Sequence, residues 1–466
     1  MSANPLAPAW LHVPADADAL AEGVWSAAAA RDAAGEIAIG GVGAPELVER
    51  YGSPVYVVDE ADARSRARRI AEAFRVAFER VGTGVAVYYA GKAFLCAEVA
   101  RWMAEGGLRL DVASRGELAV ALAAGFPAAR IGVHGNNKSV AQLEAAVEAG
   151  VGAIVIDAEI EIERLAGIAL RRGVVQPVRL RINSGVHAST HEYLATSHED
   201  QKFGVTIEDA PRLVAAIRAQ PGLRFLGLHS HLGSQIFGAE GFAEGGRRLL
   251  ALHASLLDGG EIPELNLGGG FGIAYTAADD PEPIERIADA IADALAAAAA
   301  ELGIPLPAVA IEPGRSIIGP AGTTLYTVGT VKPVVVDAPG IPAVRTYVSV
   351  DGGMSDNIRP ALYRAEYSAR IANRRSGAAP VLVRVAGMHC ESGDIVVRDE
   401  YLPGDVAPGD LLAVPATGAY GWSMASNYNW VPRPPVVAVR DGESRIIVRG
   451  ESIDDLLARD PGVNAT

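Results

Sequence analysis

The sequence predicts an α/β fold, in which a (β/α)8 barrel is followed by an all-β domain that also takes in N-terminal segments. Two patterns support this prediction. From about residue 85, short β-branched runs alternate with Ala/Leu/Glu/Arg stretches of helical period, as expected for βα units around a parallel sheet. After Gly314 the chain changes to short apolar runs separated by Gly and Pro, which is typical of an all-β domain.

Eight segments qualify as barrel strands, and each but the last precedes a helical stretch. They are VAVYYA ending at Ala90, LRLDV at Val112, RIGVH at His134, AIVID at Asp157, PVRLRIN at Asn183, RFLGLHSH at His231, ELNL at Leu267 and AVAIEP at Pro313. We expect an N-terminal arm and strand over residues 1–60 to join the β domain, the barrel to cover 61–320, and the β domain to cover 321–466. About the first 25 residues are expected to form a loose arm.

Length and charge narrow the possible functions. A chain of 466 residues exceeds the size at which one hydrophobic core stops growing, so two domains are expected. Its net charge of −15 repels phosphate backbones and anionic lipid headgroups, so no nucleic-acid or membrane partner is expected. The only cysteines, Cys96 and Cys390, are too few for a disulfide framework, and the N-terminal residues lack the basic stretch and apolar block of a signal peptide, so a cytoplasmic location is expected.

Polar residues gather where the expected barrel strands end, the place where barrel enzymes carry their active sites. They are Lys92, Asp111, Ser114, His134, Asn136, Asn137, Lys138, Asp157, Asn183, His229, His231, Ser234, Glu312 and Arg315, joined by Gly268, Gly269 and Gly270. Any one of them is more easily explained as a polar strand end. Seven or more on one rim predict a site.

The loops after strands seven and eight, LGGGFG and EPGRS, predict a phosphate cradle. Three consecutive glycines let backbone N–H groups approach an anion, and Arg315 adds a guanidinium. Lys92 lies among Tyr88, Tyr89 and Phe94, a setting unlike that of a surface lysine. A phosphate together with such a lysine predicts pyridoxal 5'-phosphate, bound to Lys92 as a Schiff base.

Glu312 would then face the pyridine nitrogen of the cofactor. A carboxylate at that place keeps the nitrogen protonated, so that the ring can take up the electrons left when a bond at Cα breaks. A strong electron sink of this kind favours decarboxylation over racemisation.

Ten ordered blocks between about residues 45 and 455 resemble the fold-type III, alanine-racemase-like pyridoxal-phosphate decarboxylases, and within them the diaminopimelate decarboxylase family. The blocks are YAGKAF, DVASRGEL, HGNNKS, HEYLATSHEDQKFG, GLHSHLGSQIF, LNLGGGFGI, EPGRSI, VSVDGGMSDNIRPALY, HCESGD and ATGAY. The resemblance implies decarboxylation of meso-2,6-diaminopimelate to L-lysine and CO2. Arg115 in DVASRGEL departs from the glycine that the family usually has there.

The resemblance also implies roles for individual residues. Lys92 carries the cofactor, Asp111 supports the lysine pocket, His231 stacks on the ring, and Glu312 meets the pyridine nitrogen. The phosphate region is assigned to Ser234, Gly268, Gly269, Gly270, Gly314 and Arg315. The substrate carboxylate is assigned to Arg315, Arg359 and Tyr363, the distal ammonium to Glu391, a place near both cofactor and substrate to Tyr420, and the proton donor to Cys390. The family further implies a homodimer in which the CESGD loop of one subunit completes the site of the other.

Three alternatives remain open from the residues alone. His229 and His231 lie on one face of a strand, where they could share a metal ion in a hydrolase, although Lys92 and the phosphate cradle would then be unexplained and no resident metal is expected. A non-catalytic pyridoxal-phosphate carrier would have no use for Cys390. Ornithine and arginine are rival substrates, but Arg359 and Tyr363 favour a distal carboxylate.

Overall fold

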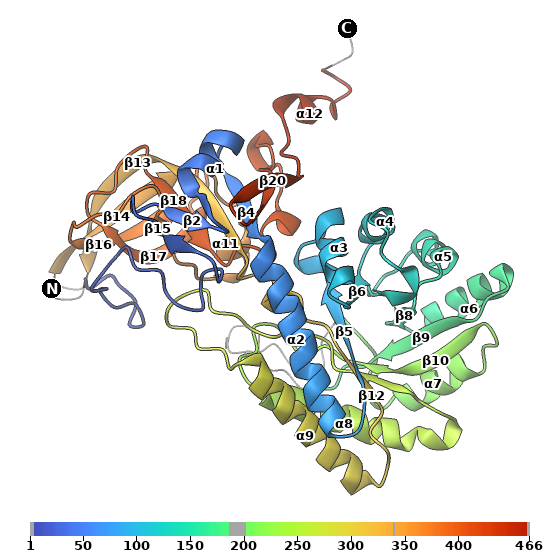
Figure 1. The fold of residues 1–466 in the computed structure, drawn as a ribbon. Helices are drawn as coiled ribbons and strands as arrows, with labels where there is room; N and C mark the ends of the chain where they lie inside the picture. The colour runs from blue at the N-terminus through green and yellow to red at the C-terminus, as the bar shows by residue number, and fades with distance from the viewer. Residues whose placement is uncertain (1–3, 186–201, 339–340, 464–466) are drawn as a thin grey trace. The chain divides into compact units, whose positions relative to one another are not determined.

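The computed structural model describes residues 4–185, 202–338 and 341–463. The chain divides into two compact units (Figure 1). The barrel unit comprises Arg64–Gly272 and Pro281–Ile317, and the β unit comprises Met1–Ala63, Ile273–Asp280 and Ile318–Thr466. Most of the motif HEYLATSHEDQKFG, from residue 191 to 201, lies outside the described residues.

Eight parallel strands close into a barrel in the order β10-β11-β12-β5-β6-β7-β8-β9. The strands are β5 (Val85–Ala90), β6 (Arg109–Val112), β7 (Ile131–Val133), β8 (Ala153–Ile156), β9 (Gln176–Arg181), β10 (Leu223–His229), β11 (Glu264–Asn266) and β12 (Ala308–Ile311). Six expected segments contain one of them, and β9 and β10 begin one residue before the segments expected for them. The predicted barrel is therefore confirmed. Six strands end one or two residues earlier than expected, which puts His134, His231 and Glu312 in the turns that follow.

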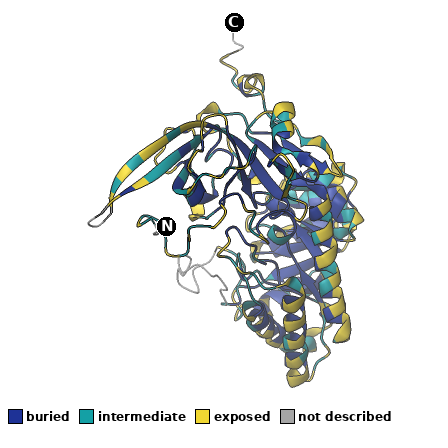
Figure 2. Ribbon diagram, turned by 60° about the vertical axis from the view of Figure 1, so that its left-hand side comes forward, coloured by how far each residue is buried: buried dark blue, intermediate teal, exposed yellow. Residues whose placement is uncertain are grey.

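Helices surround the barrel strands (Figure 1). They are α3 (Ala97–Glu105), α4 (Arg115–Ala123), α5 (Val140–Ala149), α6 (Ile160–Arg172), α7 (Ala210–Arg218), α8 (Glu240–Ser255), α9 (Ile284–Leu302) and α10 (Arg315–Ile318), preceded by α2 (Glu60–Arg80). Apolar residues at helical spacing bury one face of these helices against the strands and leave the other exposed (Figure 2). Ser114 caps α4 by accepting the Glu117 N–H, so Arg115 is the first residue of a helix and its side chain is exposed.

The β unit is built on a sheet of order β17-β16-β14-β13-β4-β19-β20. Its strands are β4 (Val55–Asp59), β13 (Gly322–Ala338), β14 (Ile341–Val350), β16 (Pro380–Ala386), β17 (Ile395–Pro403), β19 (Val436–Arg440) and β20 (Glu443–Val448), and β18 (Leu411–Pro415) joins β13 to β15 (Arg370–Ile371). The early strand β4 pairs with β13 and β19. The prediction that the β domain takes in N-terminal segments is therefore confirmed.

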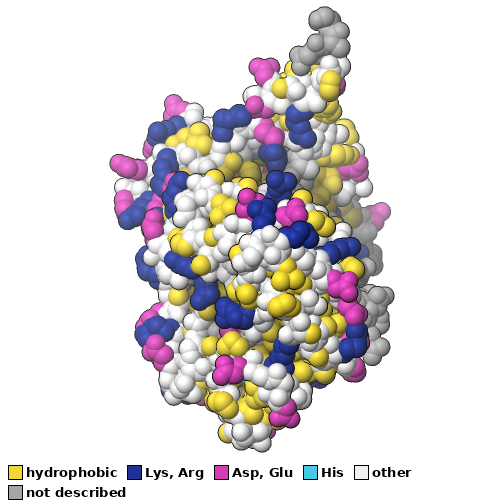
Figure 3. All heavy atoms as spheres, turned by 90° about the vertical axis from the view of Figure 1, so that its right-hand side faces the viewer, with side chains coloured by type: hydrophobic (Ala, Val, Ile, Leu, Met, Phe, Trp, Pro, Cys, Tyr) yellow, Lys and Arg dark blue, Asp and Glu magenta, His cyan; other side chains and the backbone are white. Residues whose placement is uncertain are grey.

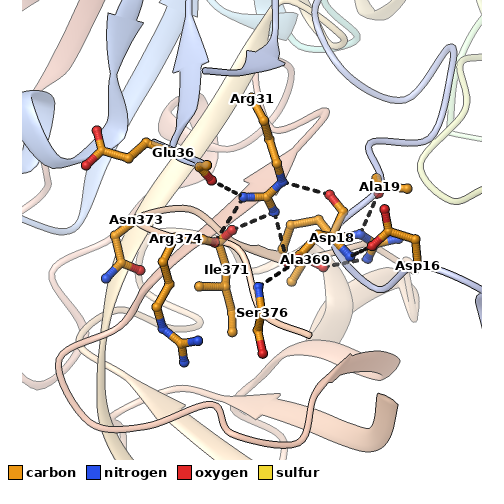
Figure 4. A network of polar contacts seen from close by, with 12 residues as sticks. Asp16, Asp18, Ala19, Arg31, Glu36, Ala369, Ile371, Asn373, Arg374 and Ser376 are labelled. Atoms are coloured by element: carbon orange, nitrogen blue, oxygen red, sulfur yellow. Dashed lines mark hydrogen bonds and ion pairs between the residues drawn. The ribbon is translucent and has the colours of Figure 1, made fainter. Parts of the chain in front are cut away.

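The N-terminal segment is not a loose arm, so that expectation is wrong for the described residues. Asp18 and Trp25 are buried, and β1 (Ala30–Arg31), β2 (Ile37–Ile39) and β3 (Val42–Gly43) form a small sheet before α1 (Ala44–Tyr51). Arg31 donates to the carbonyls of Asp18, Gly35 and Ile371, as Figure 4 shows. Asp18 also accepts the Ser376 N–H. These polar contacts and the burial of Trp25 fasten the N-terminal segment to the rest of the β unit. The irregular composition of the segment gave no indication of this packing.

Charged side chains of both signs are interspersed on the face drawn in Figure 3. Exposed charges of opposite sign also pair on the outside of the barrel unit, as in Arg80 with Asp293 and Arg212 with Glu159. Within the described part of the chain, no helix has the length and apolarity needed to cross a membrane.

Candidate active site

Lys92 lies in a short turn, Gly91–Ala93, directly after β5. Its side chain is exposed, whereas its neighbours Gly91, Ala93 and Phe94 are buried. A Cβ on Gly91 would lie 2.8 Å from the carbonyl oxygen of Asp111, so the glycine allows the ends of β5 and β6 to approach each other. The turn thus presents one accessible amine at the carboxyl end of the barrel.

Glu312 follows β12 and is held by side chains from neighbouring strand ends. Its Oε1 accepts a hydrogen bond from Asn266 Nδ2 at 2.8 Å and lies 3.2 Å from His229 Nε2. His134 Nε2 is 3.5 Å from the same oxygen. Burial alone would raise the pKa of Glu312, but the interactions with His229 and His134 lower the pKa well below its usual value. Glu312 is therefore a buried carboxylate that keeps its charge.

Asp111, at the end of β6, lies on the other side of His134. Its Oδ1 is 3.1 Å from His134 Nε2. Burial, with the nearby charge of Glu312, raises the pKa of Asp111 well above its usual value. Burial also lowers the pKa of His134 and of His229 to about 4, so both imidazoles are neutral near pH 7.

The loops after β10 and β11 form one connected structure. Ile236 N–H donates to the Gly270 carbonyl at 2.9 Å, and Gly272 N–H donates to the Ile236 carbonyl at 2.8 Å. Gly268 and Gly270 have positive φ values, 69° and 127°, which favour glycine. A Cβ on Gly269 would lie 2.0 Å from the Glu312 carbonyl oxygen. Only glycine therefore fits this loop.

Arg315, the first residue of α10, donates from Nη2 to Ser234 Oγ at 2.8 Å. This contact joins the loop after β10 to the loop after β12. Both side chains are polar and next to the glycine loop in the sheet order; Ser234 is exposed and Arg315 is half-buried. A hydroxyl and a guanidinium beside a glycine-rich backbone form a donor set suited to an anion such as phosphate.

His231 accepts a hydrogen bond on Nδ1 from the Gly269 N–H at 3.3 Å. Burial, with the charge of Lys92 second, lowers the pKa of His231 well below its usual value. His229 instead contacts Glu312, so the two histidines considered as a metal pair have different partners. The residues whose ligand atoms do converge, all within 4.8 Å of one another, are His134, His229 and Glu312.

The barrel rim fits pyridoxal phosphate. It combines an accessible lysine amine, a loop that a Cβ would fill, a hydroxyl and guanidinium for a phosphate, and a charged buried carboxylate. These are the groups that the aldehyde, the phosphate and a protonated pyridine nitrogen each require.

Arg359 begins α11 (Arg359–Tyr363) in the β unit and is buried. It donates to the Tyr367 hydroxyl, and its guanidinium carbon lies 4.7 Å from the centroid of the Tyr275 ring. The two aromatic rings therefore hold the Arg359 guanidinium in place. The N–H groups of Arg359 that contact neither Tyr367 nor Tyr275 are the ones available to a substrate carboxylate. Tyr363, at the other end of this short helix, is 58% exposed.

Cys390 and Glu391 lie in the loop between β16 and β17 of the same unit, and Cys390 is an exposed free thiol. Tyr428 donates to Glu391 Oε1 at 2.7 Å. The preceding His389 is fastened to Ser355 and Asn429, both at 2.8 Å. Tyr420, in the turn after β18, has a positive φ of 61° and is partly buried.

Sequence reasoning missed the groups that hold Glu312 and Arg359. Asn266 was not singled out, although an asparagine at the end of an expected strand, two residues before Gly268, was the available signal in the sequence; the structure buries it fully, where a polar group needs a partner. Tyr275 and Tyr367 gave no such signal, because they are 92 residues apart in the sequence and look like core aromatics.

Comparison with known proteins agrees with this geometry. Residues 64–319 match the family described as pyridoxal-dependent decarboxylase, pyridoxal binding domain. The chain is 50% identical over 447 residues to a diaminopimelate decarboxylase of Mycobacterium tuberculosis, covering 94% of this chain and 98% of the relative. It is 45% identical over 430 residues to that of Bacillus subtilis, covering 91% and 95%.

A solved structure of diaminopimelate decarboxylase from M. jannaschii in co-complex with L-lysine superposes with a TM-score of 0.85 at 31% identity, covering 94% of this chain and 99% of that one. Fold and rim residues thus define a pyridoxal-phosphate-dependent decarboxylase. Within that class, the chain belongs to the diaminopimelate decarboxylase family. The resemblance seen in the sequence blocks is confirmed, and with it the cofactor.

Proposed function

We propose that this chain decarboxylates meso-2,6-diaminopimelate to L-lysine and CO2, using the residues assigned above. The observation that carries the proposal is the 50% identity over nearly the whole chain to a relative of that name, together with a barrel rim that fits the cofactor. Pyridoxal phosphate, when bound, supplies the electron sink for the bond that breaks.

Each barrel residue has one task. Lys92 offers the amine that holds the cofactor, and Ser234, Arg315, Gly314 and the loop Gly268–Gly270 hold its phosphate. His231 covers the ring face, and the charged Glu312 keeps the ring nitrogen protonated. Asp111 supports the pocket around Lys92.

The substrate residues come from the β unit together with Arg315. Arg359 and Tyr363 bind a substrate carboxylate, which a planar guanidinium does in a bidentate manner. Glu391 pairs with the distal ammonium, and Tyr420 lies near cofactor and substrate. The Cys390 thiol delivers the proton that takes the place of the departing carboxylate.

The enzyme acts as a homodimer with shared active sites, in which Cys390 and Glu391 serve the partner subunit's cofactor. An exposed apolar patch around Cys390 supports an interface there, since Met388, Tyr428 and Trp430 are 53%, 41% and 55% exposed and such patches mark association sites. The two free cysteines favour a cytoplasmic location.

The test is release of lysine from meso-diaminopimelate by the purified protein with added pyridoxal phosphate, compared with ornithine and arginine. Activity on meso-diaminopimelate should exceed that on either rival by at least about 100-fold, because a rival substrate leaves Arg359 facing no carboxylate. Arg359→Ala should erode this preference, whereas Arg345→Ala, at a partly buried arginine paired with Asp399 in β14 and β17, should preserve it. Equal activity on ornithine would refute the substrate and leave the reaction class standing.

A further inference from the structure

Three strand ends converge on the carboxylate of Glu312. Asn266 of β11, His229 of β10 and His134 after β7 approach Oε1 at 2.8, 3.2 and 3.5 Å, and His229 Nε2 also lies 3.3 Å from Oε2. Asn266 and His229 are 0% and 1% exposed. Asn266 and His229 hydrogen-bond Glu312, whereas His134 Nε2 has no hydrogen-bond partner among the described residues. A buried charge that is met by such donors is stabilised in its charged form.

His134 stands between two carboxylates, because its Nε2 is 3.1 Å from Asp111 Oδ1 and 3.5 Å from Glu312 Oε1. Two carboxylates so close together in a buried site do not both ionise. Neither oxygen of Asp111 has a hydrogen-bond donor among the described residues, whereas Glu312 accepts hydrogen bonds from Asn266 and His229. The cluster therefore places its negative charge on Glu312 and leaves Asp111 protonated.

A buried histidine of the same unit shows what a purely structural role looks like. His253 of α8 is 2% exposed, and its Nδ1 has no hydrogen-bond partner among the described residues. Burial lowers the pKa of His253, and no carboxylate in the described part of the chain contributes to that shift. His134 and His229, in contrast, direct a ring nitrogen at an acid.

We propose that His229 and Asn266 are positioning residues that hold Glu312 as the single anion of this cluster, facing the ring nitrogen of pyridoxal phosphate. This inference rests on the proposed function, in which Glu312 meets that nitrogen. It adds that Asp111 is neutral in the working enzyme, and that two residues without a direct part in the reaction, His229 and Asn266, decide which acid carries the charge.

The experiment measures how strongly the apoprotein distinguishes pyridoxal phosphate from its carbocyclic analogue, in which C–H replaces the ring nitrogen. The two ligands share the aldehyde, the phosphate and the shape, so the ratio of their dissociation constants reports the contact with the ring nitrogen alone. Each titration is followed by absorbance. A chelator is present, so that no metal ion bound to His134, His229 and Glu312 contributes to the measured affinity.

Glu312→Gln should lower the preference for pyridoxal phosphate at least about ten-fold, the usual weight of a charge-assisted hydrogen bond. His229→Leu and Asn266→Leu should each lower it about three- to ten-fold, and His134→Leu by a smaller factor because its nitrogen is farther from Glu312. His229→Gln, which keeps a donor and is the milder change for folding, should restore most of the preference. His253→Leu is the matched control and should leave the ratio unchanged.

The outcomes distinguish a failure of the residue roles in the proposed function from a failure of the positioning role of His229 and Asn266. An unchanged ratio in Glu312→Gln would mean that Glu312 does not meet the ring nitrogen, and the residue assignment in the proposed function would fail. A reduced ratio in Glu312→Gln with unchanged ratios in folded His229→Gln and His229→Leu would overturn the positioning role only. Asp111→Asn should retain the ratio, since a neutral amide replaces a neutral acid, and a loss as large as that in Glu312→Gln would refute the charge assignment.

Discussion

Replacing Gly269 with alanine should disrupt the cofactor site through one steric contact. The added Cβ would lie 2.0 Å from the carbonyl oxygen of Glu312 and 2.9 Å from its carbonyl carbon. Ordinary contact begins near 3.4 Å, so the loop after β11 and the end of β12 would have to separate by more than 1 Å. The backbone φ of Gly269 is not in the left-handed region, so the cost comes from the contact alone.

The magnitude follows from what holds these two segments together. Glu312 N–H donates to the Gly268 carbonyl at 2.9 Å, and Leu267 N–H donates to the Ala310 carbonyl at 3.0 Å. Overpacking costs about 1–3 kcal/mol, and a weakened backbone hydrogen bond adds about 1 kcal/mol. We expect the free energy of unfolding to fall by about 2–4 kcal/mol and the affinity for pyridoxal phosphate to fall at least about ten-fold, because Glu312 moves with its backbone.

Urea denaturation followed by circular dichroism, and titration of the apoprotein with pyridoxal phosphate, measure the two effects. Gly84→Ala is the control in the same unit, because a Cβ there meets nothing within 4 Å and its φ is not positive; its stability should stay within about 0.5 kcal/mol of the parent. A Gly269→Ala protein as stable as this control, with unchanged cofactor affinity, would refute the reasoning.

Three further predictions concern charge, the cofactor and assembly. Burial raises the pKa of Asp356 from 3.8 to about 7. This carboxyl is therefore protonated up to about pH 7 in the folded protein but ionises near pH 4 in the unfolded chain. The folded protein loses stability as the pH rises from about 4 to about 7, because burying the carboxylate becomes costly. Asp356→Asn should therefore be the more stable protein at pH 8, by up to about 4 kcal/mol, and equal to the parent below pH 4 in urea denaturation; a difference independent of pH would contradict this. Lys92→Ala should lose the yellow, borohydride-reducible species that the parent forms with pyridoxal phosphate, and a label mapped to another lysine after reduction would disprove the assignment. Mixing Lys92→Ala with Cys390→Ala homodimers should restore about a quarter of all sites after subunit exchange, and no recovery despite exchange seen by mass spectrometry would argue against shared sites.

Strand positions and rim residues were predictable because both depend on local sequence. An apolar run of four to eight residues followed by a helical stretch identifies a barrel strand, and the residues at its end are then expected on the active rim. Lys92, Asp111, Glu312 and the glycines after β11 were all found in this way. The glycines after β11 indicated the site because the backbone of this loop packs so closely against neighbouring segments that a Cβ does not fit.

Contacts between distant segments were not predictable in the same way. Asn266, His229 and His134 meet Glu312 because β7, β10, β11 and β12 close one barrel, and the two tyrosines that hold Arg359 lie 84 residues before it and 8 after it. Sequence periodicity tells which face of a strand or helix is buried, but not which side chains from other elements meet it there.

The sequence by itself thus determined the elements, the rim residues and the family, because these depend on local periodicity and on ordered motifs. Only the tertiary structure decided that the N-terminal segment is packed, through Arg31 and Trp25, and that the charge of the acid cluster lies on Glu312. Both outcomes depend on burial and on donors brought together from separate parts of the chain. A single buried charge is stable only where such donors converge.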